Sequence, residues 1–88
     1  MKIEYHKNFT KQFEKLRKRE QEGVIIALQV FKKDPFASQL RNHQLQGNLS
    51  QFRSISVGGD LRLHYYEKTP NHIVVVFVAI DSHSQLYR

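Results

Sequence analysis

The C-terminal half of the chain carries histidine, aspartate and arginine side chains, the types that move protons to and from a phosphodiester. The candidates are His43, Asp60, Arg62, His64 and His83. Histidine can act as an acid or a base near neutrality, because its unperturbed pKa is about 6.5. Arginine can hold a phosphate and balance the charge that develops on it during cleavage. The set predicts metal-free acid–base chemistry on a phosphate ester.

Other kinds of site are not indicated. The chain has no cysteine, and the histidines of its C-terminal half include no pair spaced i, i+4, so we expect no metal and no cofactor. No glycine-rich loop precedes a helix and there is no G-x-S-x-G motif, so neither a nucleoside triphosphate site nor a serine hydrolase is predicted. Asp60, Arg62 and His64 could equally be ordinary exposed residues, since surface charge pairs are common.

Charge is distributed unevenly along the chain. The net charge is +6 and the sequence pI is about 9.8. Residues 1–33 contain nine Lys or Arg against four Glu, whereas residues 34–88 contain five against four acids. A basic balance favours polyanionic partners, but it also serves solubility, and composition alone leaves both open. No apolar run suits a signal peptide or a membrane span, so we expect a cytoplasmic protein with no membrane contact.

The N-terminal part reads as a short strand followed by two helices. Residues 2–6 alternate weakly and predict the strand. Asn8 is expected to cap a helix that begins near Phe9. Gly23 is expected to interrupt the helical pattern, and a second helix then runs to Asp34, because the residue before a proline disfavours helical geometry. These helices are interpreted as packing elements with a basic outer surface.

The remainder reads as a linking segment and three strands. Residues 36–49 form the link, and the strands are expected at 51–57, 60–67 and 72–80. The last run is apolar at both parities, which predicts a central strand covered on both faces. The order is β-α-α-β-β-β in a single domain over residues 1–88. The predicted class is α+β, with two N-terminal helices packed on a small, mainly antiparallel sheet.

The first hairpin can be placed in register by the polarity of its side chains. A two-residue Gly58-Gly59 loop would put Arg62 on the apolar face. A three-residue loop, Val57-Gly58-Gly59 with Gly59 left-handed, is favoured instead. It separates apolar from polar residues and gathers on one face Ser54, Ser56, Asp60, Arg62 and His64.

Three blocks of the C-terminal half resemble the YafQ-like branch of the RelE/ParE toxin superfamily. They are N-H-Q-L-Q-G at 42–47, F-R-S-I-S-V-G-G-D-L-R-L-H-Y at 52–65, and I-D-S-H-S-Q-L-Y at 80–87. They match, in order, the family's H-x-L-x-G, its aromatic–Arg pair leading to an Asp, and its closing G-[ST]-H-x-x-L-[FY]. The predicted element order also fits a RelE-like fold.

The resemblance implies a toxin that cleaves messenger RNA, usually in the ribosomal A site, by attack of the ribose 2′-hydroxyl on the adjacent phosphate without a metal ion. It implies His83 as the general acid and His43 or Asp60 as the base or its orienting partner. Arg62, which matches RelE more than YafQ, would hold the phosphate. Tyr87 would stack on a base or hydrogen-bond the phosphate. The assignment of acid against base stays open.

One departure from the family pattern concerns the proton-transfer groups. YafQ-like proteins commonly carry a second histidine a few residues before the Asp, and Ser56 stands there in this chain. His64 is the candidate substitute on the same face. Arg53, from the aromatic–Arg pair, is a further auxiliary candidate. Asp81 replaces the glycine of the last block, where it either orients His83 or caps the turn.

Two other functions compete with RNA cleavage. A ParE-like relative inhibits DNA gyrase without nuclease chemistry, but such proteins generally lack the His-Asp-His set. A degenerate module would only bind its antitoxin, and the serine at position 56 keeps this alternative open. The partners implied are an antitoxin with an acidic C-terminal segment, the ribosome and mRNA. Oligomerisation is expected mainly through the antitoxin complex.

Overall fold

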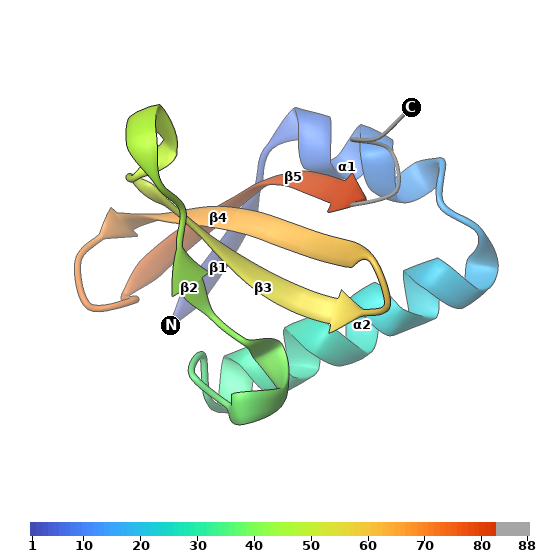
Figure 1. Cartoon of the computed structure of the whole chain (residues 1–88), viewed down its shortest axis with the longest axis horizontal. Coiled ribbons are helices and arrows are strands. Elements are labelled where there is room, and N and C mark those ends of the chain that lie inside the picture. The colour runs from blue at the N-terminus through green and yellow to red at the C-terminus, as the bar shows by residue number, and fades with distance from the viewer. Residues whose placement is uncertain (83–88) are drawn as a thin grey trace.

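The computed structural model describes residues 1–82 as two helices and a five-stranded sheet. The sheet order is β1-β5-β4-β3-β2, in which β1 runs parallel to β5 and every other pairing is antiparallel. Figure 1 shows the course of the chain. The elements are β1 (Lys2–Tyr5), α1 (Lys7–Glu14), α2 (Lys18–Lys33), η1 (Ser38–Leu40), β2 (His43–Gln44), η2 (Gly47–Leu49), β3 (Phe52–Gly58), β4 (Leu61–Thr69) and β5 (Val74–Ser82).

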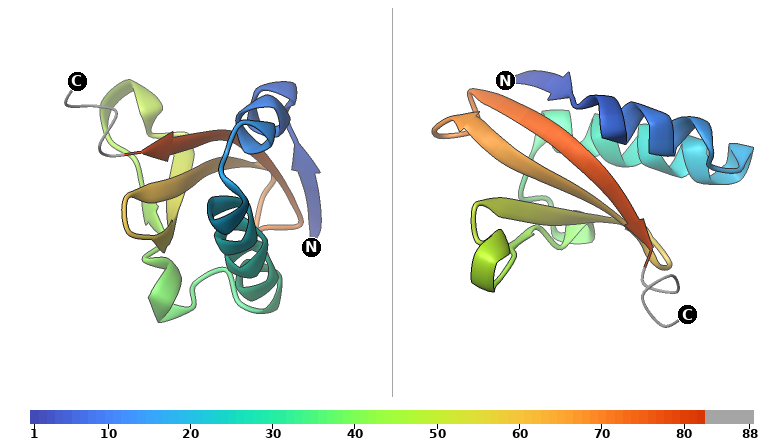
Figure 2. Two further views of the ribbon diagram at one scale, coloured as in Figure 1. Left: turned by 90° about the vertical axis from the view of Figure 1, so that its right-hand side faces the viewer. Right: turned by 90° about the horizontal axis from the view of Figure 1, so that it is seen from above.

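Both helices lie on the same side of the sheet (Figure 2). The core forms between the helices and the sheet. There Phe31 of α2 makes edge contacts with Tyr65 and Phe77, with ring centroids 4.9 Å and 5.2 Å apart. The strands supply the other half of the core through Ile55 and Leu63, both fully buried. The predicted α+β class and the β-α-α-β-β-β order are confirmed. Within residues 1–82, no helix is long and apolar enough to span a membrane.

The beginning of α1 differs from the prediction. His6, not Asn8, is the capping residue, and its Nδ1 accepts a hydrogen bond from the Asn8 backbone N–H at 3.0 Å. Asn8 lies inside the helix, and its side chain donates to the Val78 carbonyl at 3.1 Å. A neutral histidine nitrogen can cap a helix as an acceptor, so the asparagine is free to tie α1 to β5.

The predicted break at Gly23 is wrong. Gly23 lies within α2, and the break falls earlier, between Glu14 and Lys18. The Arg17 N–H donates to the Glu20 carboxylate at 3.1 Å, so it has a partner where the helix starts. A Cβ at position 23 would lie 3.1 Å from Val57 Cγ1, so the glycine serves the close approach of α2 to β3.

The first hairpin confirms the predicted separation of faces but not the predicted pairing. Ile55 pairs with Leu63, and Ser56 pairs with Arg62. A bulge lies between Ser56 and Gly58, and the chain turns through Gly59, with φ +55°, and Asp60. The pairing is displaced by two residues from the predicted one. The alternation of faces is preserved, but Asp60 moves from the strand into the turn.

Two further features of the sheet were not predicted correctly. The link over 36–49 contains a two-residue edge strand, β2, whose His43 pairs with Ser54. The apolar run predicted to be central is β5, which lies between β1 and β4, while β4 occupies the middle of the sheet. Val75, Val76 and Phe77 are nevertheless buried in succession, which explains why both parities are apolar.

Candidate functional site

Strand register gathers polar side chains on one face of the sheet. This face is opposite to the one that the two helices cover, as the ribbon in Figure 2 shows. One row across the sheet runs from His43 on β2 through Ser54 on β3 to His64 on β4. The adjacent row on the same face consists of Ser56 on β3, Arg62 on β4 and Asp81 on β5. Directly opposed residues of antiparallel strands share a face, and their Cβ atoms lie about 4.5–5.5 Å apart. Two imidazoles, a guanidinium and a carboxylate therefore occupy neighbouring positions.

The charges of this face act on His64. Burial lowers the pKa of His64 below its usual range, and the positive charges of Arg62 and His43 lower it further, while Asp81 opposes them. Desolvation is the largest of these effects. The lowered pKa favours the neutral ring of His64, which can donate one hydrogen bond and accept another.

A backbone carbonyl two residues earlier in the chain favours one tautomer of His43. Its Nδ1 lies 2.9 Å from the carbonyl oxygen of Arg41. A carbonyl can only accept, so Nδ1 carries the hydrogen. In the neutral ring the Nε2 lone pair is then free, and the side chain is exposed. The geometry suits a base that takes a proton through Nε2.

Asp60 lies apart from the histidine row. It is exposed in the β3–β4 turn and lines a hollow of about 410 Å³ together with Arg17, Arg19 and Ser82. The acid that pairs across the sheet with Arg62 is Asp81. The carboxylate next to the histidines is therefore one that sequence reasoning treated only as a partner of His83 or a turn cap.

Arg53 lies on the opposite face of the sheet and is partly buried. Its Nε donates to Asn42 Oδ1 at 2.7 Å, and its guanidinium lies 5.3 Å from the centroid of the Phe36 ring. It pairs across the sheet with Tyr65, which faces the helices. Of the two auxiliary candidates, His64 therefore lies on the polar face and Arg53 on the opposite one.

Two serines of β3 lie on the same face as the histidines. Ser54, between His43 and His64, is fully buried, and its hydroxyl has no hydrogen-bond partner within residues 1–82. Ser56, at the position of the family's second histidine, is half-buried opposite Arg62. Neither serine can supply a proton near neutral pH. His83 and Tyr87, the remaining candidates, lie outside the described residues.

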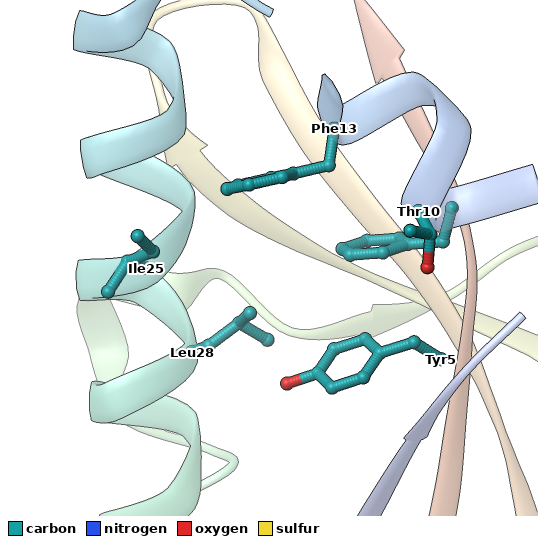
Figure 3. A pocket seen from close by; sticks show the side chains of 6 residues that line it. Tyr5, Thr10, Phe13, Ile25 and Leu28 are labelled. Atoms are coloured by element: carbon teal, nitrogen blue, oxygen red, sulfur yellow. The ribbon is translucent and has the colours of Figure 1, made fainter. Parts of the chain in front are cut away.

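A second hollow, of about 350 Å³, lies on the helical side of the molecule. It is bounded by aromatic and aliphatic side chains from β1, α1 and α2 (Figure 3). They are Tyr5, Phe9, Thr10, Phe13, Ile25 and Leu28. The hollow contains no acid, base or cation for catalysis. Over residues 1–82 there is also no group of three His, Asp or Glu placed to hold a metal ion.

Three features of the site were not visible in the sequence: the strand β2, the position of Asp81 and the contacts of Asn42. β2 is too short for periodicity to reveal, so the pairing of His43 with β3 could not be foreseen. Asp81 ends an apolar run, and only the register of β5 on β4 places it beside Arg62. Asn42 stood in the first matched block, but nothing in its spacing indicated contact with Tyr65.

Comparison with known proteins gives a consistent picture. A family model described as the bacterial toxin of type II toxin–antitoxin system, YafQ, matches residues 1–88. The fold is similar to that of YafQ from Escherichia coli BL21(DE3), with 21% identity, coverage of 98% of this chain and 97% of that one, and a TM-score of 0.75. It is also similar to the YoeB/ParE toxin from Agrobacterium tumefaciens, with 17% identity, 94% and 99% coverage and a TM-score of 0.76.

A third similar structure is the toxin–antitoxin complex DinJ–YafQ from Escherichia coli. Identity is 23%, coverage is 98% of this chain and 96% of that chain, and the TM-score is 0.70. No curated protein sequence matches the chain significantly. At identities of 17–23% the solved structures show a shared fold. The match to the family model, over residues 1–88, shows the family.

Proposed function

The chain belongs to the YafQ family of toxins of bacterial type II toxin–antitoxin systems, and from that premise we propose that it is a metal-independent endoribonuclease acting on mRNA. The observation that carries the proposal is the shared face of His43, Arg62, His64 and Asp81. A nuclease without metal needs a base, a cation and an acid around one phosphate. This face supplies the first two.

His43 acts as the general base in this scheme. With Nδ1 bound to the Arg41 carbonyl, its Nε2 takes the proton of the ribose 2′-hydroxyl. The 2′-oxygen forms a bond to the adjacent phosphorus as the bond from phosphorus to the 5′-oxygen breaks, leaving a cyclic phosphate. Arg62 holds the phosphate and balances its developing charge. His83 returns a proton to the 5′-oxygen, and Tyr87 stacks on a base.

His64 and Asp81 support these groups. A neutral His64 leaves Arg62 as the cation of this face and can donate a hydrogen bond to a phosphate oxygen. Asp81 lies opposite Arg62 in the strand pairing and adds a negative charge to the same face. Asp60, exposed in the turn and away from the histidine row, is assigned no proton-transfer role.

The proposed setting is the ribosome. The first 33 residues carry nine Lys or Arg against four Glu, which favours contact with ribosomal RNA through phosphates. The antitoxin expected for a type II system would neutralise the same charge with an acidic segment that folds on binding. In the DinJ–YafQ complex the toxin is bound to its antitoxin. Such a complex, formed in the cytoplasm, is also the proposed route to oligomers.

Induced expression of the chain in a bacterial host tests the proposal. Primer extension should find new mRNA ends at A-site codons, and they should be lost in His43→Gln and Arg62→Ala. Lys68→Ala is the matched control, because Lys68 is an exposed cation on the same strand that pairs with Glu4 at 3.2 Å. Intact mRNA with arrested DNA replication would favour gyrase inhibition instead. Intact mRNA with normal growth would favour an antitoxin-binding module.

A further inference from the structure

Asn42 has a saturated and directional set of hydrogen bonds, although it faces away from the histidine row. Its Oδ1 accepts from Arg53 Nε at 2.7 Å. Its Nδ2 donates to the Tyr65 hydroxyl at 2.7 Å and to the Pro35 carbonyl at 2.9 Å. Both amide hydrogens are therefore used, and flipping the amide would oppose donors to donors. The side chain of Asn42 has one orientation.

The anchor to which Asn42 is attached is part of the core. Tyr65 is fully buried and packs edge-on against Phe31. The Tyr65 hydroxyl, which accepts from Asn42, also lies 2.7 Å from His72 Nε2. His72 Nδ1 in turn faces the Glu67 carboxylate at 3.5 Å. Hydrogen bonds in such a network polarise and so strengthen one another, which holds each side chain in place.

The residues on either side of Asn42 form the turn that controls His43. Arg41 is left-handed, with φ +48° and ψ +44°, which is unfavourable for a residue with a side chain. Its N–H donates to the Ser38 carbonyl at 3.2 Å, and its carbonyl accepts from His43 Nδ1. An unfavourable backbone conformation persists only where the surroundings hold it. Asn42, between the two residues, is the one bonded to the core.

We propose that Asn42 is a positioning residue, which uses its bonds to Arg53, Tyr65 and Pro35 to hold the Arg41 carbonyl against His43 Nδ1 and so keeps His43 Nε2 free to act as a base. The tautomer is a property of the folded chain. Its use in RNA cleavage rests on the function proposed above, and the two can fail separately.

Correlation of imidazole nitrogens with ring protons by NMR tests the tautomer directly. Spectra of the whole chain would be recorded at a pH of about 8, where histidines are ordinarily neutral, and His43 assigned through His43→Gln. Wild type should show His43 protonated at Nδ1. Asn42→Ala should reduce that preference by about fivefold, the factor expected for loss of a typical hydrogen bond. The rate of RNA cleavage by the ribosome-bound chain should fall in proportion to the fraction of His43 that is protonated at Nδ1, and so by less than about fivefold.

Gln44→Ala is the matched control. Gln44 is also an amide side chain beside His43, but it donates to the Ser50 carbonyl at 2.6 Å and ties down η2 instead of the Arg41 turn. It should leave the tautomer unchanged. Should Asn42→Ala fail to fold, Tyr65→Phe removes one of the anchors while keeping the ring, and should shift the tautomer in the same direction by less.

Three results would overturn the proposal: His43 protonated at Nε2 in wild type, no change of tautomer in Asn42→Ala, or an equal change in Gln44→Ala. A tautomer that shifts as expected in a chain that cleaves no RNA would leave the positioning role intact. That outcome would overturn only the nuclease function.

Discussion

Tyr65→Phe removes one oxygen atom from the middle of the hydrogen-bond chain that joins the link before β2 to the β4–β5 turn. The Tyr65 hydroxyl lies 2.7 Å from both Asn42 Nδ2 and His72 Nε2. Phenylalanine keeps the packing of the ring against Phe31, so the substitution isolates the hydrogen bonds. Each bond contributes about 0.5–1.5 kcal/mol net, so the loss of both predicts a destabilisation of about 2 kcal/mol.

Thermal and urea unfolding of the two proteins would measure this difference. A change of 1 kcal/mol moves the midpoint of a domain this small by roughly 4–8 °C. Burial raises the pKa of Tyr65 above its usual value, so the hydroxyl keeps its proton and the difference should be the same from neutral to mildly alkaline pH. An unchanged dependence on urea would show that the unfolded state is unaffected.

Tyr66→Phe provides the control for the loss of a tyrosine hydroxyl. Tyr66 is the next residue of β4, lies half-exposed on the opposite face and packs edge-on against Phe52. Its substitution should change stability by less than about 0.5 kcal/mol. The reasoning is refuted by a Tyr65→Phe variant as stable as wild type, or by equal losses in the two variants.

Three further predictions concern the histidine face and the helix contact. Burial lowers the pKa of His64 in the folded chain, so just below pH 6.5 the unfolded chain binds more protons than the folded one. The free energy of unfolding should therefore fall as the pH falls through this range. The His64→Gln variant should show a weaker fall, as measured by urea titrations at successive pH values. Asp81→Asn should lower the pKa of His64 further, and Asp60→Asn should not, as followed by NMR titration. Val57 limits the space for a new Cβ at position 23, so Gly23→Ala should stabilise the fold more in a Val57→Ala background than in wild type. The difference between the two backgrounds should be about 1 kcal/mol at most. Equal effects in a double-mutant cycle would contradict this prediction.

The sequence allowed the order of elements to be predicted because each long element has a periodic signal. β3 and β4 alternate polar and apolar side chains, and this alternation predicted which residues share a face, including Arg62 and His64. It could not predict the pairing, because a shift of two residues preserves every face. The bulge before Gly58 produces such a shift, and it moves Asp60 off the sheet.

The support of the site was less predictable than its reactive groups. Histidine and arginine are conspicuous in a sequence, and a motif brings them to attention. Asn42, by contrast, depends on a contact with Tyr65, 23 positions along the chain. Helix ends were also misassigned, because His6 caps through a ring nitrogen and Gly23 serves a contact with Val57. Such roles depend on tertiary neighbours and not on local preference.

The register also bears on the departure from the family pattern at Ser56. Ser56 pairs with Arg62, so His64, two residues along β4, is its diagonal neighbour on the same face. Diagonal neighbours lie about 7–8 Å apart, within reach of long side chains. An imidazole based at position 64 therefore serves the same part of the face as one based at position 56. Its lowered pKa keeps it uncharged beside Arg62. We therefore propose that His64, on the adjacent strand, supplies the imidazole that position 56 lacks in this chain.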